Sequence, residues 1–183
     1  MKKVLIPIAN GTEEMEAVII IDILRRAGIH VTIISDDDIV TCSRGVKIIP
    51  DIKYDQLNTD EIYDAIALPG GVQGVENFIA NEKLIAILKK HKQNEALISA
   101  ICAAPKVLKH SQLLQENQEI TSHPSIKNIL QNYNYKNDKF VLSNNILTSQ
   151  GAGTAFDFSL KLVELLIGSE KAEEIKKAIV FNM

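Results

Sequence analysis

The chain has 183 residues, of which 46% are hydrophobic and 23% charged, and its formal net charge is −3. These values fit one globular domain, residues 1–183, and exclude an intrinsically disordered chain or a strongly basic nucleic-acid-binding protein. No apolar run reaches the roughly 18 residues that a membrane span needs. The apolar run after the initial Met-Lys-Lys is soon broken by Pro7, so we expect no signal peptide and a cytoplasmic protein.

The first 35 residues predict a strand, a helix and a second strand. Val4–Ala9 is apolar and predicts a buried strand, although Pro7 lacks the N–H that a sheet ladder uses. Thr12 is the predicted N-cap of a helix over Met15–Ala27, whose apolar residues recur with helical spacing. Ile29–Ser35 predicts the next strand. Such a unit is typical of a parallel sheet with a crossover helix.

The middle of the chain continues this alternation. Asp36–Asp55 contains short β-like pieces, which predict a hairpin at the edge of the sheet. Tyr63–Leu68 and Ala96–Ile101 predict two more buried strands, and we expect one long helical region between them over Val75–Lys92. Pro105–Lys109 predicts a short helix, because proline is favoured in the first turn.

The last third predicts a short helix, a hairpin and two longer helices. The short helix is expected over Ile126–Leu130. Phe140–Ser149 predicts a hairpin with Asn144-Asn145 at its turn. The longer helices are expected over Ala155–Ile167 and Glu170–Ala178. The whole order of elements predicts an α/β fold with a mainly parallel sheet between layers of helices.

Cys102 follows the strand predicted over residues 96–101 and directly precedes a helix. The small residues Ala103 and Ala104 permit a sharp turn there, and the backbone N–H groups that start a helix favour a negative charge. Such surroundings lower the pKa of a thiol from its usual value of about 8.5. The arrangement is similar to the nucleophile elbow of hydrolases, with sulfur in place of oxygen. The turn alone leaves open the alternative of a buried, inert cysteine.

Two further groups are expected at the same edge of the sheet, because they also follow predicted parallel strands. Gly70 and Gly71 let backbone N–H groups face a pocket, as an oxyanion hole requires, and their spacing does not match a phosphate-binding loop. The first helix begins with Glu13, Glu14 and Glu16. One of these carboxylates is expected to turn toward the sulfur as acid or base, and the other two to be solvated partners of the helix dipole. Helix geometry alone does not choose among them.

The sequence shows no metal-binding pattern. Its four histidines have no ligand spacing with each other or with the two cysteines, so we expect no metal and no cofactor. Cys42 and Cys102 form no Cys-x-x-Cys pair, and we expect two reduced, unpaired thiols, with Cys42 away from the catalytic edge. His123 follows another strand and precedes Pro124; it is either an exposed polar residue or a catalytic histidine.

Several short motifs, spread over essentially the whole chain, occur together in a specific order. They are Gly11–Glu16, Arg25–Gly28, Leu68–Gly71, Ala100–Pro105, His123-Pro124 and Leu147–Thr154. In these motifs the chain resembles the ThiJ/PfpI superfamily, in the branch of the Parkinsonism-associated deglycase and its bacterial relatives. The resemblance implies a single ThiJ/PfpI-like domain, a flavodoxin-like three-layer sandwich and a homodimer.

The resemblance also implies a role for each residue of the thiol site. Cys102 would be the nucleophile and the oxidation-sensitive thiol, and Glu16 would be the glutamate that hydrogen-bonds its sulfur. His123 matches the histidine near the sulfur in animal members. The backbone donors around the sulfur would be Gly70, Gly71 and Ala103.

The resemblance implies two alternative functions. In the first, the protein is a cofactor-free glyoxalase or deglycase, in which Cys102 attacks a small dicarbonyl or a glycated amine or thiol. In the second, it is a redox-responsive chaperone or oxidative-stress sensor, in which Cys102 is oxidised to a sulfinate that Glu16 stabilises. Protease and amidotransferase activities are disfavoured, because His123 alone makes a weak triad. We expect no membrane partner and no specific nucleic-acid partner.

Overall fold

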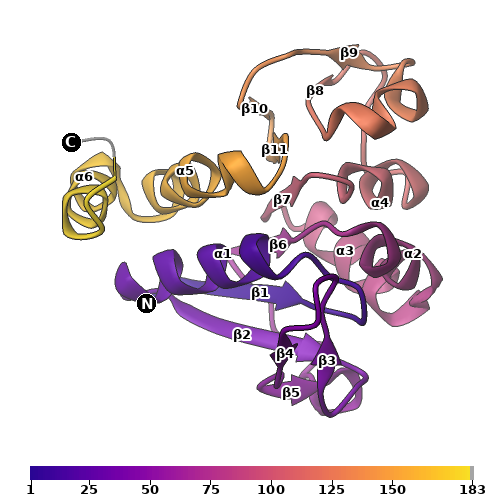
Figure 1. The fold of residues 1–183 in the computed structure, drawn as a ribbon. Coiled ribbons are helices and arrows are strands. Elements are labelled where there is room, and N and C mark those ends of the chain that lie inside the picture. Colours follow the sequence, from indigo (N-terminus) through magenta and orange to yellow (C-terminus); the bar gives the residue numbers. More distant parts are fainter. Residues whose placement is uncertain (182–183) are drawn as a thin grey trace.

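The apolar runs form a seven-stranded sheet in the computed structural model, which describes residues 1–181 (Figure 1). Its strands are β1 (Lys3–Pro7), β2 (His30–Ser35), β5 (Ile52–Lys53), β6 (Ala65–Leu68), β7 (Leu97–Ile101), β10 (Phe140–Ser143) and β11 (Ile146–Ser149). The order across the sheet is β10-β11-β7-β6-β1-β2-β5, and every neighbouring pair is parallel except β10 and β11. The predicted α/β class with a mainly parallel sheet is confirmed.

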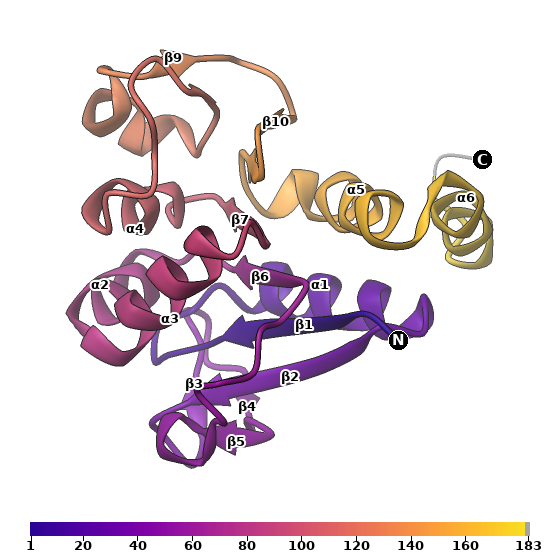
Figure 2. The same cartoon turned by 180° about the vertical axis from the view of Figure 1, so that it is seen from behind.

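Helices cover both faces of this sheet. They are α1 (Glu14–Arg26), α2 (Val72–Ala80), α3 (Glu82–Gln93), α4 (Pro105–His110), α5 (Ala155–Ile167) and α6 (Ser169–Ala178), with the 3-10 turns η1 (Tyr54–Gln56), η2 (Pro124–Leu130) and η3 (Ala152–Thr154). The helices α1, α5 and α6 share one core cluster, and α2, α3 and α4 share the other (Figures 1 and 2). The result is a three-layer sandwich.

Strand β1 shows why the predicted strands are apolar throughout. Val4 and Ile6 lie in the core cluster of α1 and α5, whereas Leu5 lies in the opposite cluster. All three side chains are fully buried. A parallel strand that is covered on both faces has no solvated side, so it carries no alternation of apolar and polar residues. The strand ends at Pro7, two residues before the predicted end.

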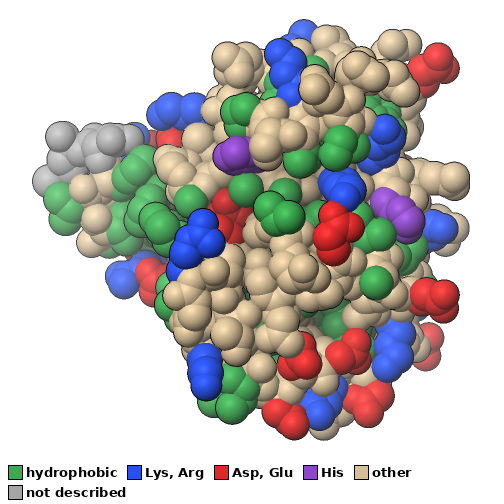
Figure 3. All heavy atoms as spheres, turned by 45° about the vertical axis from the view of Figure 1, so that its right-hand side comes forward, with side chains coloured by type: hydrophobic (Ala, Val, Ile, Leu, Met, Phe, Trp, Pro, Cys, Tyr) green, Lys and Arg blue, Asp and Glu red, His purple; other side chains and the backbone are tan. Residues whose placement is uncertain are grey.

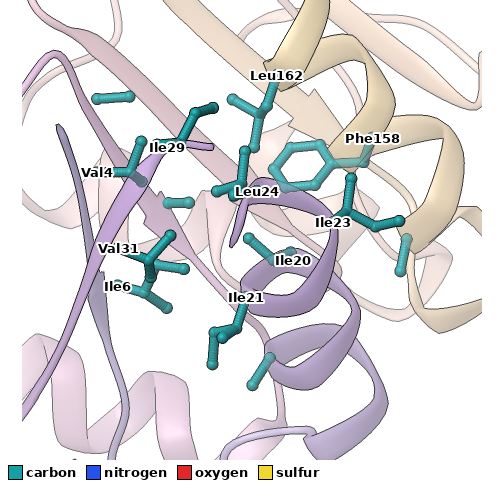
Figure 4. Packing of buried hydrophobic residues seen from close by; sticks show 14 of the residues in the cluster. Val4, Ile6, Ile20, Ile21, Ile23, Leu24, Ile29, Val31, Phe158 and Leu162 are labelled. Carbon is teal, nitrogen blue, oxygen red and sulfur yellow. The ribbon is translucent and has the colours of Figure 1, made fainter. Parts of the chain in front are cut away.

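The helix pair α1 and α5 closes one of these clusters. Ile20 and Leu24 of α1 pack with Phe158 and Leu162 of α5 (Figure 4), and all four side chains are fully buried. Burial of an apolar side chain of this size contributes about 1.5–3 kcal/mol. This packing fixes α1 on the sheet, and the first turn of α1 carries the glutamates of the candidate site.

One predicted helical region is two helices in the structure, α2 and α3. The break lies at Asn81, whose backbone is extended, with φ −88° and ψ 95°. The side-chain oxygen of Asn81 accepts a hydrogen bond from the N–H of Leu84 at 3.1 Å, as the N-cap of α3. The prediction of one helix over residues 75–92 is wrong, because this side chain satisfies the backbone of a new helix start.

The predicted N-cap of α1 is also wrong. The cap is Glu13, whose carboxylate accepts a hydrogen bond from the N–H of Glu16 at 2.8 Å. The hydroxyl of Thr12 accepts instead from the N–H of Ala9 at 3.0 Å. Thr12 therefore stabilises the turn that precedes the helix, and its side chain is not available to the helix start.

Two small sheets lie outside the main one. The strands β3 (Val40–Thr41) and β4 (Lys47–Ile48) pair only with each other, so the predicted edge hairpin exists but the edge strand of the main sheet is β5. The strands β8 (Glu119–Ile120) and β9 (Asn134–Tyr135) lie in a projection beyond α4 (Figures 1 and 2). The hairpin of β10 and β11, with its turn at residues 144 and 145, is confirmed.

The surface of the described residues carries charges of both signs (Figure 3) and no membrane-spanning helix. No helix within residues 1–181 is both long enough and apolar enough to cross a membrane. On the face shown in Figure 3, basic and acidic side chains are interspersed. Such a mixture of charges gives that face no strong field of either sign.

Candidate active site

A cavity of about 610 Å³ lies at the edge of the sheet where four parallel strands end. Its lining includes Gly11 after β1, Gly71 after β6, Cys102 after β7 and Ala152 after β11. This edge is where open α/β sheets place their ligand sites. The predicted site residues that line the cavity are Glu16, Gly71, Cys102, Ala103 and His123. The structure therefore brings most of the predicted site together.

Cys102 lies at a strained turn between β7 and α4. Its φ is +63°, in the left-handed region that a residue other than glycine rarely adopts. The turn is held by two backbone hydrogen bonds: the Cys102 N–H donates to Ser149 O at 3.0 Å, and its carbonyl accepts from the N–H of His123 at 2.8 Å. The side chain is partly buried in the cavity wall. The predicted sharp turn at this cysteine is confirmed.

Glu16 reaches the thiol from the first turn of α1. Its side chain is fully buried, and Oε2 accepts a hydrogen bond from the N–H of Gly70 at 2.7 Å. A Cβ on Gly70 would lie 2.6 Å from Cys102 Cβ and 2.8 Å from Glu16 Oε2, so the two side chains meet directly over this glycine. The second oxygen, Oε1, is buried and has no hydrogen-bond partner. A buried oxygen in this state is suited to carry a proton.

The two groups share an unfavourable environment for charge. Burial raises the pKa of Glu16 from its ordinary value of 4.5 to about 7, against the opposing effect of the Gly70 N–H. Burial also raises the pKa of the Cys102 thiol, and the Glu16 carboxylate raises it further. The expectation that the turn lowers the thiol pKa is therefore wrong, because burial and the Glu16 carboxylate outweigh the effect of the turn. The pair favours one negative charge rather than two.

Two backbone N–H groups act on the sulfur in the opposite direction to burial. Hydrogen bonds from Gly71 and Ala103 act to lower the pKa of Cys102. Gly71 has a φ of +96°, and a Cβ there would lie 2.6 Å from the backbone nitrogen of Glu13, so only glycine fits this close approach. The N–H of Gly70 donates to Glu16 instead of the sulfur, so Gly70 positions the carboxyl group.

His123 lies at the exposed rim of the cavity. Its Nδ1 accepts a hydrogen bond from the backbone N–H of Ser125 at 3.2 Å and lies 2.8 Å from the Ser125 hydroxyl. In the neutral ring Nε2 then carries the proton. Among the described residues no carboxylate orients this ring, so the geometry contains no Cys-His-acid triad.

Cys42 lines the same cavity as Cys102, and the expectation that it lies away from the catalytic edge is wrong. The hairpin of β3 and β4 folds over the start of α1 and carries Cys42 there. Both cysteines are free thiols, as predicted. Burial, followed by the charges of Glu14 and Glu13, raises the pKa of Cys42 to about 11, so this thiol stays protonated.

Glu14 is buried, whereas the sequence predicts that two of the three glutamates at the start of α1 are solvated. Its side chain is 6% exposed, and its carboxylate accepts from the Ser43 hydroxyl and from the Arg44 N–H, both at 2.7 Å. The sequence does contain a signal for this burial. Glu14 lies three residues before Ala17, so both lie on the face of α1 that packs into the core. The partners themselves come from a loop about 30 residues away, which no local pattern indicates.

The described residues contain no group of three or more His, Cys, Asp or Glu side chains arranged to hold a metal ion. A second groove, of about 650 Å³, lies beyond the ends of β1 and β2. There Asp36 accepts a hydrogen bond from Asn81, and Asp37 accepts one from Asn10. Because these carboxylates already have partners, the thiol cavity is the stronger candidate for chemistry.

Comparison with known proteins finds a family model, relatives and solved structures that match nearly the whole chain. The family model described as the DJ-1/PfpI family matches residues 2–165. Protein dj-1beta of Drosophila melanogaster is 42% identical over 185 residues, which cover 98% of this chain and 97% of the relative. The Caenorhabditis elegans protein named glutathione-independent glyoxalase DJR-1.2 is 34% identical over 173 residues, which cover 93% and 91%. The crystal structure of Drosophila melanogaster DJ-1beta matches with a TM-score of 0.94 at 39% identity, over 100% of this chain and 99% of that one.

Proposed function

Since this chain belongs to the DJ-1/PfpI family, we propose that it is a cofactor-independent enzyme of the glyoxalase or deglycase type, with reactive dicarbonyls as substrates. One relative carries the name glutathione-independent glyoxalase. The observation that carries the proposal is the meeting of Cys102 and the buried carboxyl of Glu16 over Gly70. These groups are a nucleophile and a proton carrier, held on rigid elements beside a cavity.

In the first step the Cys102 thiol passes its proton to Glu16 Oε1, and the thiolate adds to the aldehyde carbon of methylglyoxal and forms a carbon–sulfur bond. The carbonyl oxygen becomes an alkoxide and takes the proton held on Glu16 Oε1, which leaves a hemithioacetal and a Glu16 carboxylate. The N–H groups of Gly71 and Ala103, which favour charge on the sulfur, also stabilise the neighbouring alkoxide.

In the second step the Glu16 carboxylate removes the hydrogen from the carbon bound to sulfur and returns it to the neighbouring carbon. The hydroxyl proton of the hemithioacetal passes to the former ketone oxygen, so the former aldehyde carbon is oxidised to a thioester and the ketone carbon is reduced to an alcohol. Water then cleaves the thioester and releases lactate and the Cys102 thiol. A pKa near 7 suits a group that must both give and take a proton at neutral pH.

For a glycated amine, attack of Cys102 would release the amine and give the same hemithioacetal. The later steps are then shared by both substrates. We assign His123 to contact with substrate or water at the rim, because its Nδ1 is occupied by Ser125 and no carboxylate orients it.

Conversion of methylglyoxal to lactate without glutathione tests the proposal. We expect lactate from the wild type and none above background from Cys102→Ser. Cys42→Ser, which removes the other thiol of the same cavity, is the matched control and should retain most of the turnover. Equal turnover by the wild type and Cys102→Ser would show that Cys102 is not the nucleophile.

One observation favours a redox function as the second candidate. Glu16 Oε1 is buried without a partner beside the sulfur, and a protonated carboxyl there would donate to an oxygen of a Cys102 sulfinate. Peroxide treatment followed by peptide mass spectrometry measures that sulfinate. Its formation at Cys102 in a protein that makes no lactate would support a sensor or chaperone over an enzyme.

We also propose a homodimer and a cytoplasmic location. Met15 and Val18 lie three residues apart on α1 and are 56% and 47% exposed, and Val46, which hydrogen-bonds to the first turn of α1, is 49% exposed. Apolar side chains gathered in this way are typical of a contact surface. The two free cysteines fit a reducing compartment.

A further inference from the structure

Glu14 is a buried carboxylate that the proposed reaction does not use. It accepts hydrogen bonds from the Ser43 hydroxyl at 2.7 Å and from the backbone N–H groups of Arg44 at 2.7 Å and Val46 at 3.4 Å. A buried charge is costly unless several donors compensate it, and hydrogen bonds to a charged acceptor are the stronger kind. All three donors belong to the loop between β3 and β4, so Glu14 ties this loop to α1.

That loop forms one wall of the thiol cavity. Cys42, Ser43 and Arg44 line the cavity together with Cys102. The strands β3 and β4 pair only with each other, so the main sheet does not hold the wall in place. An isolated two-stranded hairpin is marginally stable, and the position of its loop depends on contacts outside the hairpin.

The contacts of the hairpin with the rest of the protein divide into two sets. Its base is held by the N–H of Gly11, which donates to Thr41 O at 2.9 Å, by Asn10 Oδ1, which accepts from the Thr41 N–H at 2.8 Å, and by Val40, which is fully buried in the core cluster of α1. Its loop is held by Glu14 and by the N–H of Ser43, which donates to Thr12 O at 2.8 Å. Glu14 supplies three of these loop contacts from one side chain, two residues before Glu16 on the same helix. The cavity wall and the proton carrier therefore share one rigid support.

We propose that Glu14 is a positioning residue that sets the shape of the thiol cavity and so limits the size of the dicarbonyl that reaches Cys102. This inference rests on the proposed function for its substrate class, whereas the shape of the wall is measurable without turnover. Small dicarbonyls such as methylglyoxal enter the cavity, and a bulky analogue such as phenylglyoxal is hindered. Release of the wall reduces this discrimination.

The charge state of Glu14 agrees with hydrogen bonds to the β3–β4 loop that persist at neutral pH. Burial acts to raise the pKa of Glu14, but the hydrogen bonds from Ser43, Arg44 and Val46 bring it below its ordinary value. The carboxylate therefore stays ionised at neutral pH. Its charge also helps to keep the Cys42 thiol protonated, so that Cys42 does not compete with Cys102 for an electrophile in the same cavity.

Alkylation of Cys102 by a small and a bulky reagent tests the proposal in a Cys42→Ser background. We compare iodoacetamide with its N-phenyl derivative in the parent, in Glu14→Gln and in Ser43→Ala. The rate with iodoacetamide divided by the rate with its N-phenyl derivative should fall by about ten-fold in Glu14→Gln, the factor expected when hydrogen bonds to a charged acceptor are lost. It should fall by less in Ser43→Ala. Amide hydrogen exchange at Arg44 and Val46 should accelerate in parallel.

Asp22→Asn is the matched control, because it removes a carboxylate from the exposed face of the same helix, where Asp22 pairs with Arg26. It should change neither measurement. In turnover assays, Glu14→Gln should raise kcat/KM for phenylglyoxal relative to methylglyoxal, through KM more than through kcat. A general loss of stability would lower kcat/KM for both substrates alike.

The outcomes separate the two proposals. An unchanged alkylation ratio with unchanged amide exchange in both variants would overturn the role of Glu14. Absence of turnover in the wild type would overturn the proposed function, and the alkylation ratio and exchange would still decide the role of Glu14. If Glu14→Gln does not fold, Ser43→Ala decides alone, because it removes one donor and leaves the helix start intact.

Discussion

At the scale of single residues, the site depends on one negative charge shared by two acidic groups. Burial is the largest cause that raises the pKa of Glu16 and of Cys102 alike. A carboxylate and a thiolate in contact repel, so ionisation of one group keeps the other protonated, and the two groups titrate as a pair. In the proposed reaction the proton that remains goes to the substrate alkoxide, and the Glu16 carboxylate that is left then moves the substrate hydrogen between two carbons.

Glu16→Gln tests this assignment. Glutamine keeps a hydrogen-bond donor beside the sulfur but cannot shuttle a proton, so we expect turnover of methylglyoxal to fall by about 10²–10⁴-fold. Alkylation of Cys102 by iodoacetamide should be at least as fast as in the wild type, because burial still raises the thiol pKa but the Glu16 carboxylate no longer adds to that rise. Near-full turnover would show that Glu16 is not the proton carrier and would favour the redox function.

Gly70→Ala tests how tightly the two side chains meet. The added methyl group would lie 2.6 Å from Cys102 Cβ and 2.8 Å from Glu16 Oε2, so one of them must move. We expect a loss of about 1–3 kcal/mol in the free energy of unfolding, the usual range for overpacking, together with a loss of turnover. Gly153→Ala is the control, because a Cβ there meets nothing within 4 Å. Equal effects of the two substitutions in urea unfolding and activity assays would contradict the described contact.

At the scale of elements, much of the fold is predictable because the sheet is covered on both faces. Strands such as β1 then have continuous apolar runs, and α5 lies at its predicted bounds, Ala155–Ile167. The turn of the β10–β11 hairpin is determined by local sequence, since Asn144 adopts the positive φ of +53° that asparagine tolerates. The thiol turn is local as well, which is why Cys102 stands out in the sequence.

The features that sequence reasoning missed arise from a local side-chain cap in one case and from a distant loop in the other. The helix break at Asn81 follows a side-chain cap, and the burial of Glu14 follows from a loop about 30 residues later. The choice of Glu16 among three glutamates had a usable signal. Glu16 lies four residues before Ile20 and eight before Leu24, on the stripe of α1 that packs into the core. A carboxyl on that stripe must be buried.

At the scale of the whole molecule, the buried Glu16 makes stability depend on pH. Burial raises the pKa of Glu16 from 4.5 to about 7 in the folded state, so the folded protein holds this proton more tightly than the unfolded chain. The contribution of the protonated carboxyl to the free energy of unfolding is complete below pH 4.5 and is lost as pH rises to about 7. We expect the free energy of unfolding to fall by about 3 kcal/mol over this range.

Urea unfolding at several pH values, in a Cys102→Ser background, measures this contribution. The parent should lose stability between pH 4.5 and 7 relative to the matched variant with Glu16→Gln, in which no carboxyl titrates at this position. The background removes the coupled thiol, so the difference reports Glu16 alone. A difference between the two proteins that does not change with pH would contradict a raised pKa for Glu16.

The exposed apolar side chains on α1 make a prediction about assembly. Of the apolar residues 18–21, Ile20 and Ile21 are used by the core, whereas Val18 remains 47% exposed, near Met15 at 56%. A surface of this kind is stable in water when a second copy covers it, and a specific interface buries about 800 Å² on each partner.

Light scattering at micromolar concentration should give twice the chain mass of 20.3 kDa. Val18→Glu should shift that mass toward one chain by placing a charge in the contact, whereas Ile129→Glu, on the projection beyond α4, should not. A wild-type mass of one chain would exclude the dimer.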